Sequence, residues 1–298
     1  MELEVGLRWA VEACRSAEPG PAAAFAGGAL FAPEDLARFV PTDVLQDLCA
    51  RDQIYLASDK AQFIFTCTNY NNLVSIMPTR QDVTADFVHV NGDTFWLLQL
   101  VWEHGTPGQR AVELGAGNAI VAAHMVARYH TVLATDLPGP WLHYAQLTLA
   151  ANAGRGRPSA AVACDVATAL RPGSFDLVAA NSPWSPAAPT DRDGNELTFM
   201  AGGSTGTELP ARFLRESAAL LRPGGVAITL CLDPEFEDGS RPLMPVLDEL
   251  RSQGYALACI DSPVFPTDTV TERLRANRLP TLRSARHIAV VVRNERDV

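Results

Sequence analysis

The chain has 298 residues, 47% of them hydrophobic, and a formal net charge of -10. This length permits one large domain with an appendage, and the acidic balance argues against nucleic-acid binding, which needs a basic surface to displace counterions from phosphates. No apolar run approaches the roughly 20 residues of a membrane span, and the opening MELEVGLRWAVEAC lacks the basic end of a signal peptide. We therefore expect a globular, cytoplasmic protein with no membrane partner.

The six cysteines are scattered, without a C-x-x-C pair or a nearby histidine cluster. This pattern predicts ordinary buried thiols and no metal site. Lys60 is the only lysine among many arginines, and Ala, Gly and Pro are abundant. That composition is typical of a GC-rich, bacterial genome.

Residues 1–90 differ in pattern from the rest of the chain. Two stretches with helical apolar spacing, 2–17 and 33–51, are followed by short β-like runs at 54–57 and 63–68 and by the turn-rich TNYNN. We expect a small, mostly helical N-terminal cap on the substrate side.

Residues 91–298 alternate between helices and continuous apolar strands. We expect helices at 93–104, 118–129, 140–152, 208–221 and 243–252, and strands at RAVEL, TVLATD, SAAVACD, FDLVAAN, GGVAITLCL, YALACID and HIAVVVR. Apolar strands of this kind are covered on both faces. The pattern predicts a Rossmann-like α/β domain with a doubly wound, mostly parallel, seven-stranded sheet, whose ligands bind outside the carboxyl ends of the strands.

The first strand ends in VELGAGNA, residues 112–119. Gly115 and Gly117 lack a Cβ atom, so the backbone can turn tightly and bring its N–H groups to a ligand at the helix start. By itself, a G-x-G pair is also consistent with a simple tight turn.

The next two strands end in acids. Asp136 follows Gly115 by about 20 residues, the spacing at which an acid meets ribose hydroxyls, although a helix cap is the alternative. Ile120 occupies the place of the third dinucleotide-site glycine, and Glu113 suits a cationic ligand better than a pyrophosphate. Asp165 can accept from an adenine amine or cap a helix, and Val166 can pack on the base.

VELGAGNA, Asp136 and Asp165, in this order, resemble the cofactor half of class I S-adenosylmethionine-dependent methyltransferases, from about Asp93 to the C-terminus. The resemblance implies that the methionine part lies against Glu113 and the glycine loop, the ribose on Asp136 and the adenine near Asp165. It also implies an antiparallel last strand. The predicted cofactor site comprises Thr94, Glu113, Gly115, Ala116, Gly117, Asp136, Leu137, Asp165, Val166 and Asn181.

Asn-Ser-Pro-Trp follows the fourth strand and resembles the N-P-P-Y motif of amino and amide N-methyltransferases, including HemK/PrmC-type protein-glutamine enzymes. The side-chain carbonyl of Asn181 and the main-chain carbonyl of Ser182 can each accept an N–H from the acceptor nitrogen. Pro183 restricts Ser182 to an extended conformation. Trp184 offers a stacking or cation–π surface. Ser182 and Trp184 depart from the family's proline and tyrosine, and a proline turn without function is the alternative.

Two further segments strengthen the resemblance. FMAGGSTGTELPARFLRESAALLRPGG resembles the Gly-Gly loop and long helix of the glutamine methyltransferases. VHVNGDTFWLL resembles the region before their first strand, in which Thr94 is the residue that approaches the cofactor carboxylate. The loop 185–196 has no match, so the acceptor can differ from the family's.

Other candidates are weaker. The six histidines form no evident dyad, and His89, near the segment that precedes the predicted domain, is the only candidate among them. Phe95, Trp96 and Trp102 are expected to pack a helix on the sheet, with Phe95 as an alternative cofactor contact. Residues 70–72 are candidates for lining the pocket from the cap.

The sequence thus predicts an S-adenosylmethionine-dependent N-methyltransferase acting on an amine or amide of a small molecule, such as an amino acid derivative or secondary metabolite in biosynthesis. Its product is S-adenosylhomocysteine, and no metal is required. The alternatives are a protein-glutamine N5-methyltransferase, an adenine N6-methyltransferase, a non-catalytic S-adenosylmethionine-binding protein, and an O-methyltransferase, which would want a general base where none is apparent. The oligomeric state cannot be read from the sequence.

Overall fold

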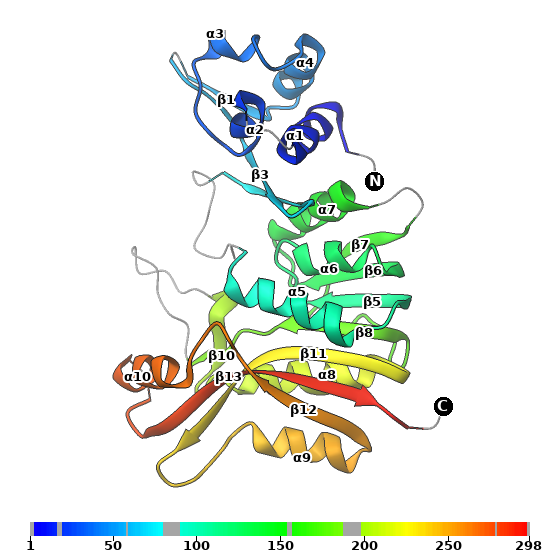
Figure 1. The fold of residues 1–298 in the computed structure, drawn as a ribbon, viewed down its shortest axis with the longest axis vertical. Helices are drawn as coiled ribbons and strands as arrows, with labels where there is room; N and C mark the ends of the chain where they lie inside the picture. The colour runs from blue at the N-terminus through cyan, green and yellow to red at the C-terminus, as the bar shows by residue number, and fades with distance from the viewer. Residues whose placement is uncertain are drawn as a thin grey trace.

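A twisted seven-stranded sheet forms the centre of the molecule, with strand order β12-β13-β11-β8-β5-β6-β7 (Figure 1). The computed structural model describes residues 3–16, 20–57, 59–79, 90–153, 157–186, 198–277 and 279–296. The strands are β5 (Gly108–Leu114), β6 (Tyr129–Asp136), β7 (Ser159–Ala163), β8 (Phe175–Asn181), β11 (Leu221–Phe236), β12 (Tyr255–Asp261) and β13 (Leu282–Asn294).

The pairing directions confirm the predicted doubly wound, mostly parallel sheet. β5 pairs in parallel with β6 and β8, β6 with β7, and β8 with β11. β13 is antiparallel to both of its neighbours, β11 and β12. The antiparallel last strand that the resemblance implied is therefore present.

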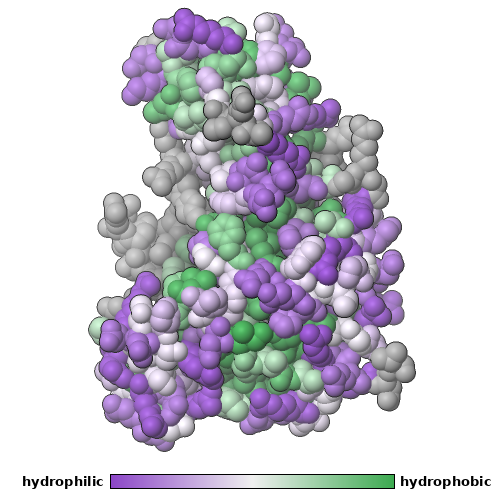
Figure 2. Space-filling model, in the orientation of Figure 1, coloured by the Kyte–Doolittle hydropathy of each residue, from purple (hydrophilic) through white to green (hydrophobic). Residues whose placement is uncertain are grey.

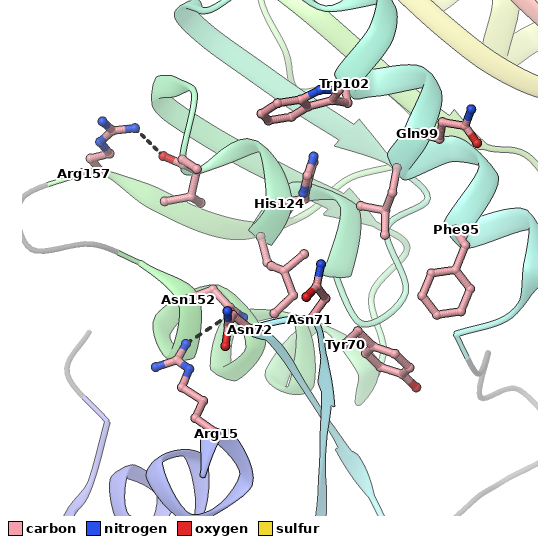
Figure 3. A pocket seen from close by; sticks show the side chains of 15 residues that line it. Arg15, Tyr70, Asn71, Asn72, Phe95, Gln99, Trp102, His124, Asn152 and Arg157 are labelled. Atoms are coloured by element: carbon pink, nitrogen blue, oxygen red, sulfur yellow. Dashed lines mark hydrogen bonds between the residues drawn. The ribbon is translucent and has the colours of Figure 1, made fainter. Parts of the chain in front are cut away.

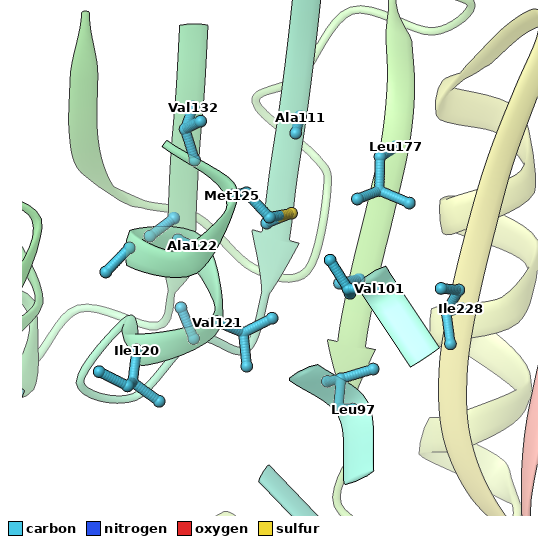
Figure 4. Close-up of a cluster of buried hydrophobic side chains, with 14 of the residues drawn as sticks. Leu97, Val101, Ala111, Ile120, Val121, Ala122, Met125, Val132, Leu177 and Ile228 are labelled. Carbon is cyan, nitrogen blue, oxygen red and sulfur yellow. The ribbon is translucent and has the colours of Figure 1, made fainter. Parts of the chain in front are cut away.

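Helices cover both faces because successive strand residues point to opposite sides. Leu177 of β8 packs into a core with α5 (Gly92–His104), α6 (Ile120–Met125) and α7 (Trp141–Asn152), part of which is drawn in Figure 4. Its neighbour Val178 packs into a second core with α8 (Glu208–Leu220) and α9 (Met244–Ser252). Continuous apolar strands thus bury both faces, as their sequence predicts.

The sequence did not reveal helix α10 (Thr267–Asn277), which lies between β12 and β13. Its sequence, TDTVTERLRAN, is mostly polar, and only a narrow apolar stripe, Val270 and Leu274, is buried against the extended arms of β11 and β13. Figure 1 shows α10 in orange at the left edge of the molecule, beside β13. The expected helix at 118–129 was also too long, since α6 ends at Met125.

The cap combines helices with two hairpins, shown in blue and cyan at the top of Figure 1. Its elements are α1 (Val5–Arg15), α2 (Pro21–Ala26), α3 (Pro33–Leu36), α4 (Thr42–Ala50), β1 (Ile54–Leu56), β2 (Ala61–Phe63), β3 (Phe65–Tyr70) and β4 (Leu73–Pro78). Strand β4 was not predicted. It hydrogen-bonds through Val74 and Ile76 to side chains of α7, so the cap sits on the β7 edge of the sheet. A domain boundary near residue 90 stays a prediction.

Among the described residues, no helix combines the length and the apolar character needed to cross a membrane.

Candidate active site

A cavity of about 660 Å³ lies at the carboxyl ends of β5, β6 and β8. The chain runs from β5 to β6 on one side and later returns to β8 on the other, so this is the topological switch point at which open α/β sheets bind ligands. The predicted site residues that line it are Thr94, Glu113, Gly115, Ala116, Gly117, Asp136, Leu137, Asp165, Val166, Asn181, Ser182, Pro183 and Trp184. The structure thus brings every predicted site residue to one cavity.

The glycine loop after β5 has the backbone that glycine permits, with φ of +62° at Gly115 and +52° at Gly117. Its N–H groups, however, are used inside the protein. The amide of Ala116 donates to the Thr135 carbonyl at 2.9 Å, and that of Gly117 donates to Asp136 Oδ2 at 2.7 Å. The expectation that the loop offers its N–H groups to a ligand is wrong for these two residues, because neighbouring β6 takes them.

Asp136 is fixed beside this loop at the end of β6. Its second oxygen, Oδ1, accepts from the Leu137 amide at 2.7 Å. Burial raises the pKa of Asp136, while the hydrogen bonds from Gly117 and Leu137 oppose that rise. Carboxylate oxygens accept more than one hydrogen bond each, so Asp136 retains capacity for hydroxyl donors in the cavity.

Glu113 is a buried carboxyl in the cavity wall. Its Oε2 accepts from the Ala122 amide of α6 at 2.6 Å. Burial raises the pKa of Glu113 to about 8, the Ala122 hydrogen bond opposes the rise, and the negative charge of Asp136 adds to it. A cationic ligand group would stabilise the ionised form, whereas a phosphate would not. With the Ala116 and Gly117 amides already bonded to β6, this end of the cavity fits a cation and disfavours a dinucleotide.

Two residues after β7 form the wall beyond Asp136. Asp165 pairs with Arg212 of α8 at 2.8 Å, a partner that the sequence did not indicate. Val166 is buried with φ of +53°, a conformation that is strained for a β-branched residue and costs on the order of 1–3 kcal/mol. The Thr135 hydroxyl donates to its carbonyl at 2.9 Å. Packing and this hydrogen bond hold Val166 in place.

The first turn of α5 also lines the cavity. Asn91 and Thr94 form a capping box, in which the Thr94 amide donates to Asn91 Oδ1 at 3.3 Å and the Asn91 amide donates to Thr94 Oγ1 at 3.4 Å. The Thr94 hydroxyl is therefore already engaged in capping the helix. The positive end of this helix nonetheless favours a carboxylate in the cavity.

Asn181 is the last residue of β8 and is half-buried. None of the described residues forms a hydrogen bond with its side-chain amide. The next residue, Ser182, is buried and donates through Oγ to the Leu230 carbonyl of β11 at 2.6 Å. A proline could not make this bond. The Ser182 hydroxyl thus fixes this segment to the neighbouring strand β11.

The Gly-Gly segment packs directly on this motif. β10 (Ala201–Gly203) pairs in parallel with β9 (Ser185–Pro186). A Cβ atom on Gly202 would lie 2.8 Å from the Trp184 Cα and 2.9 Å from the Pro183 carbonyl oxygen. Only glycine fits this approach without a shift of one backbone segment, so the Gly-Gly segment and the Asn-Ser-Pro-Trp motif are in close contact.

Trp184 packs into an aromatic cluster and is only partly exposed. Its ring centroid is 4.8 Å from that of His287 and 5.8 Å from that of Phe265. Its side chain also hydrogen-bonds Asp93. The ring face of Trp184, which the sequence predicts to be open for stacking on a substrate, is therefore partly covered by protein.

Several residues near Trp184 line the cavity or contact its wall although the sequence analysis did not predict them. His287 Nδ1 lies 3.7 Å from Asp93 Oδ1, so the view that the histidines form no dyad is wrong for this pair. Phe265 and four residues of α10, namely Thr269, Val270, Arg273 and Leu274, complete the wall. No local sequence pattern predicts these contacts, because α5, the end of β8 and the segment from β12 to β13 meet only in the folded chain.

A second cavity, of about 840 Å³, lies between the cap and the outer face of α5 and α6 (Figure 3). Tyr70, Asn71 and Asn72 line this cavity and not the first, contrary to the expectation. Phe95 and Trp102 also line it and are 46% and 61% exposed, so only Trp96 of the three aromatics is core. In Figure 2, apolar surface gathers below the cap in this region. His89 and the loop 187–197 lie outside the described residues.

Within the described part of the chain, no group of histidine, cysteine, aspartate or glutamate side chains could hold a metal ion. Cys67, Cys164 and Cys231 are buried, as expected, whereas Cys49 and Cys259 are exposed and Cys14 is intermediate.

No protein-family model matches this chain, and no curated protein does. Among solved structures, it is similar to the putative transferase PH0793 of Pyrococcus horikoshii, with 10% identity, 87% of this chain and 85% of that chain covered, and a TM-score of 0.49. It is also similar to TYW2 of M. jannaschii in complex with AdoMet (11% identity, 80% and 91% covered, TM-score 0.49). It is similar as well to the E. cuniculi Mtq2–Trm112 complex, which methylates the eRF1 termination factor, with 18% identity, 70% of this chain and 99% of that chain covered, and a TM-score of 0.45. At these values the similarity concerns the fold alone.

Proposed function

We propose that this protein is an S-adenosylmethionine-dependent methyltransferase that methylates a nitrogen of a small molecule. One observation carries the proposal: the glycine loop, Asp136 and the Asn181-Ser182-Pro183-Trp184 segment open into the same cavity, at the switch point of the sheet. The first two suit a nucleoside with a cationic tail. The third suits a planar or amine nitrogen.

The polar groups of the cavity match the parts of S-adenosylmethionine. Buried Glu113 and the N-terminus of α5 would receive the ammonium and carboxylate of the methionine part. Asp136 would accept from the ribose hydroxyls, and Val166 and Leu137 would pack against the adenine, with Asp165 and Arg212 at its edge. When bound, the cofactor supplies an electrophilic methyl group on sulfur.

At the acceptor end, the residues position the nitrogen. Asn181 offers a side-chain carbonyl at the end of β8, and the Ser182 carbonyl follows it on a segment tied to β11 by the Ser182 hydroxyl. Holding reactants in this way can lower the barrier by about 7–11 kcal/mol. The protein's work is therefore orientation, together with the handling of a proton.

The rest of the acceptor end favours a small molecule with an apolar body. Its walls are Trp184, Phe199, Met200, Leu209, Phe265, Val270 and Leu274. A protein glutamine is the second candidate, since the Gly-Gly segment that resembles the glutamine methyltransferases packs on the Asn-Ser-Pro-Trp motif. The acidic charge of -10 continues to disfavour nucleic acid.

Transfer of a labelled methyl group tests the proposal. Methyl-labelled S-adenosylmethionine is incubated with the protein and an extract of the source cells, which is then divided by a size filter. We expect label in the filtrate, and its loss with Asn181→Ala but not with Gln99→Ala, an exposed amide on α5. Label retained on protein would favour the glutamine candidate, and absence of S-adenosylmethionine binding in calorimetry would refute the proposal.

A further inference from the structure

A buried acid and a buried imidazole meet at the acceptor end of the cavity. Asp93 lies in the first turn of α5 and lines the cavity, with a side chain only 6% exposed. His287 lies on β13, and its side chain is fully buried. The two come within 3.7 Å, Nδ1 to Oδ1.

Aromatic rings from three other positions enclose this pair. The ring centroid of His287 lies 4.8 Å from Trp184, 5.4 Å from Phe265 and 5.6 Å from Trp96. The Trp184 side chain also hydrogen-bonds Asp93. The residue that follows Ser182 and Pro183 in the acceptor motif is thus in direct contact with both members of the pair.

The pair has unused hydrogen-bonding capacity. Within the described residues, Asp93 Oδ1 and both ring nitrogens of His287 are buried without a hydrogen-bond partner. Leaving such groups unsatisfied destabilises the folded state, so buried polar atoms of this kind require an explanation. The 3.7 Å between Oδ1 and Nδ1 is longer than a hydrogen bond, so the two side chains must approach slightly before a proton on one atom can be donated to the other.

We propose that Asp93 is the proton acceptor for the methylated group, that His287 positions and stabilises the proton on it, and that the acceptor is an amine with an apolar or aromatic body. This inference rests on the proposed methyltransferase function. An amine enters as its ammonium ion, for which a carboxylate framed by aromatic rings is a suitable partner. An amide or alcohol carries no such charge.

The proton and electrons balance as follows. The substrate ammonium gives one proton to the Asp93 carboxylate, and the freed lone pair on nitrogen forms the new C–N bond. The C–S bond breaks, its electron pair stays on sulfur, and the product leaves as the methylated ammonium ion. Protonated Asp93 donates toward His287 Nδ1 until that proton returns to solvent after product release.

The ionisation of the pair agrees with this role at neutral pH. Burial raises the pKa of Asp93 to about 6, and the Trp184 hydrogen bond limits the rise. Burial lowers the pKa of His287 to about 4. The pair therefore carries one negative charge near pH 7, which attracts an ammonium group.

Other charged groups reach the same cavity from the surrounding elements. Glu113 lies on β5, Asp136 at the end of β6, Asp165 after β7, Arg212 on α8 and Arg273 on α10. They border the predicted cofactor region or the α10 wall, so substitutions within the pair are needed to assign a pH effect to it.

Three probes of one shape test the acceptor class: phenethylamine, 2-phenylethanol and 2-phenylacetamide, each incubated with the full chain and S-adenosylmethionine. We expect methylation of the amine alone, with kcat/KM rising with pH through an apparent pKa of about 6. Methylation of the alcohol or the amide instead, or failure of the amine to bind the S-adenosylhomocysteine complex, would overturn the inference. Wild-type protein that does not bind S-adenosylmethionine would instead refute the proposed function.

Variants test the two roles. Asp93→Asn should lower kcat by about 100-fold and retain S-adenosylmethionine affinity. It should also abolish the rising limb of the profile of kcat/KM against pH. His287→Phe should shift that limb to lower pH, because the protonated carboxyl loses its acceptor, whereas a merely structural histidine would leave the limb in place. The matched controls are Asp248→Asn, at an exposed position of α9, and His130→Gln, at an exposed position of β6. If Asp93→Asn does not bind S-adenosylmethionine, Asp93→Glu must keep the rising limb, and its absence there would refute the role of Asp93.

Discussion

The two ends of the active-site cavity are built in different ways. At the predicted cofactor end, the glycine loop and Asp136 come from consecutive units of the chain, and their hydrogen bonds are made to each other. At the proposed acceptor end, α5, the segment after β8, the Gly-Gly segment, β13 and α10 converge, and several buried polar atoms there have no hydrogen-bond partner among the described residues. The first end is a satisfied, locally encoded frame, and the second is an assembled surface with spare chemical capacity.

This difference suggests a division of labour. A frame whose polar groups are already satisfied binds its ligand without rearrangement, which favours one constant ligand such as a cofactor. An end assembled from distant segments can change with any one of them, so it suits a variable acceptor. Substitutions at the two ends should therefore affect different kinetic quantities.

The largest effect is expected at the acceptor end. Asn181→Ala should lower kcat by about 10²–10³, as for the loss of one preorganised polar contact, with S-adenosylmethionine affinity nearly unchanged. Steady-state rates of labelled transfer and calorimetry measure the two quantities. Wild-type turnover in this variant would remove Asn181 from the chemistry.

At the cofactor end, Asp136→Ala should weaken S-adenosylmethionine binding by about 10–100-fold. The variant loses charged acceptors worth about 1.5–3 kcal/mol and releases the amides of Gly117 and Leu137. Calorimetric titration checks this. Unchanged affinity would contradict the assignment of Asp136, and an effect on kcat alone would contradict the proposed division.

The contact between the motifs can be tested by adding one methyl group. Gly202→Ala places a Cβ about 2.8 Å from Trp184 Cα, so the backbone of one segment must move. We expect a loss of about 1–3 kcal/mol in the free energy of unfolding and a lower kcat at nearly unchanged cofactor affinity. Gly173→Ala is a matched control for a glycine with no atom near its Cβ position, although its φ of +65° adds strain. Equal kcat in the two variants would argue against the contact.

The smallest effect concerns Glu113 and pH. Burial raises the pKa of Glu113 from its ordinary value of 4.5 to about 8, so the folded state holds a proton that the unfolded state lacks between these values. Stability from this group is complete below about pH 4.5 and is lost as the pH rises through 8. Between pH 6.5 and 8 the loss should be roughly 1.5 kcal/mol. Denaturant unfolding of wild type and Glu113→Gln measures it, and equal slopes in the two proteins would contradict the buried, protonated carboxyl.

Much of this could be predicted from the sequence. Continuous apolar strands alternating with helices determined the doubly wound sheet, because such strands must be covered on both faces. The positions of Gly115, Asp136 and Asn181 after strands determined the cavity, since parallel strands bring their carboxyl ends to one edge.

Other features depended on contacts between distant segments. The sequence places Asp93 and His287 far apart, and each follows its local helix or strand pattern, so nothing local marks them as a pair. Helix α10 was missed because its polar sequence gains its buried stripe only against the arms of β11 and β13. The loop sequence predicts N–H groups that are free for a ligand. The Ala116 and Gly117 amides are instead bonded to Thr135 and Asp136 of β6, which no pattern within the loop indicates.

The sequence by itself therefore determined the sheet and the edge at which the candidate site lies, since both follow from periodicity and from chain direction. Only the tertiary structure decided that Asp93 lies beside His287, what covers Trp184 and which amides are already bonded. These depend on close packing between segments far apart in the chain, where displacements of an ångström or less make or remove a hydrogen bond.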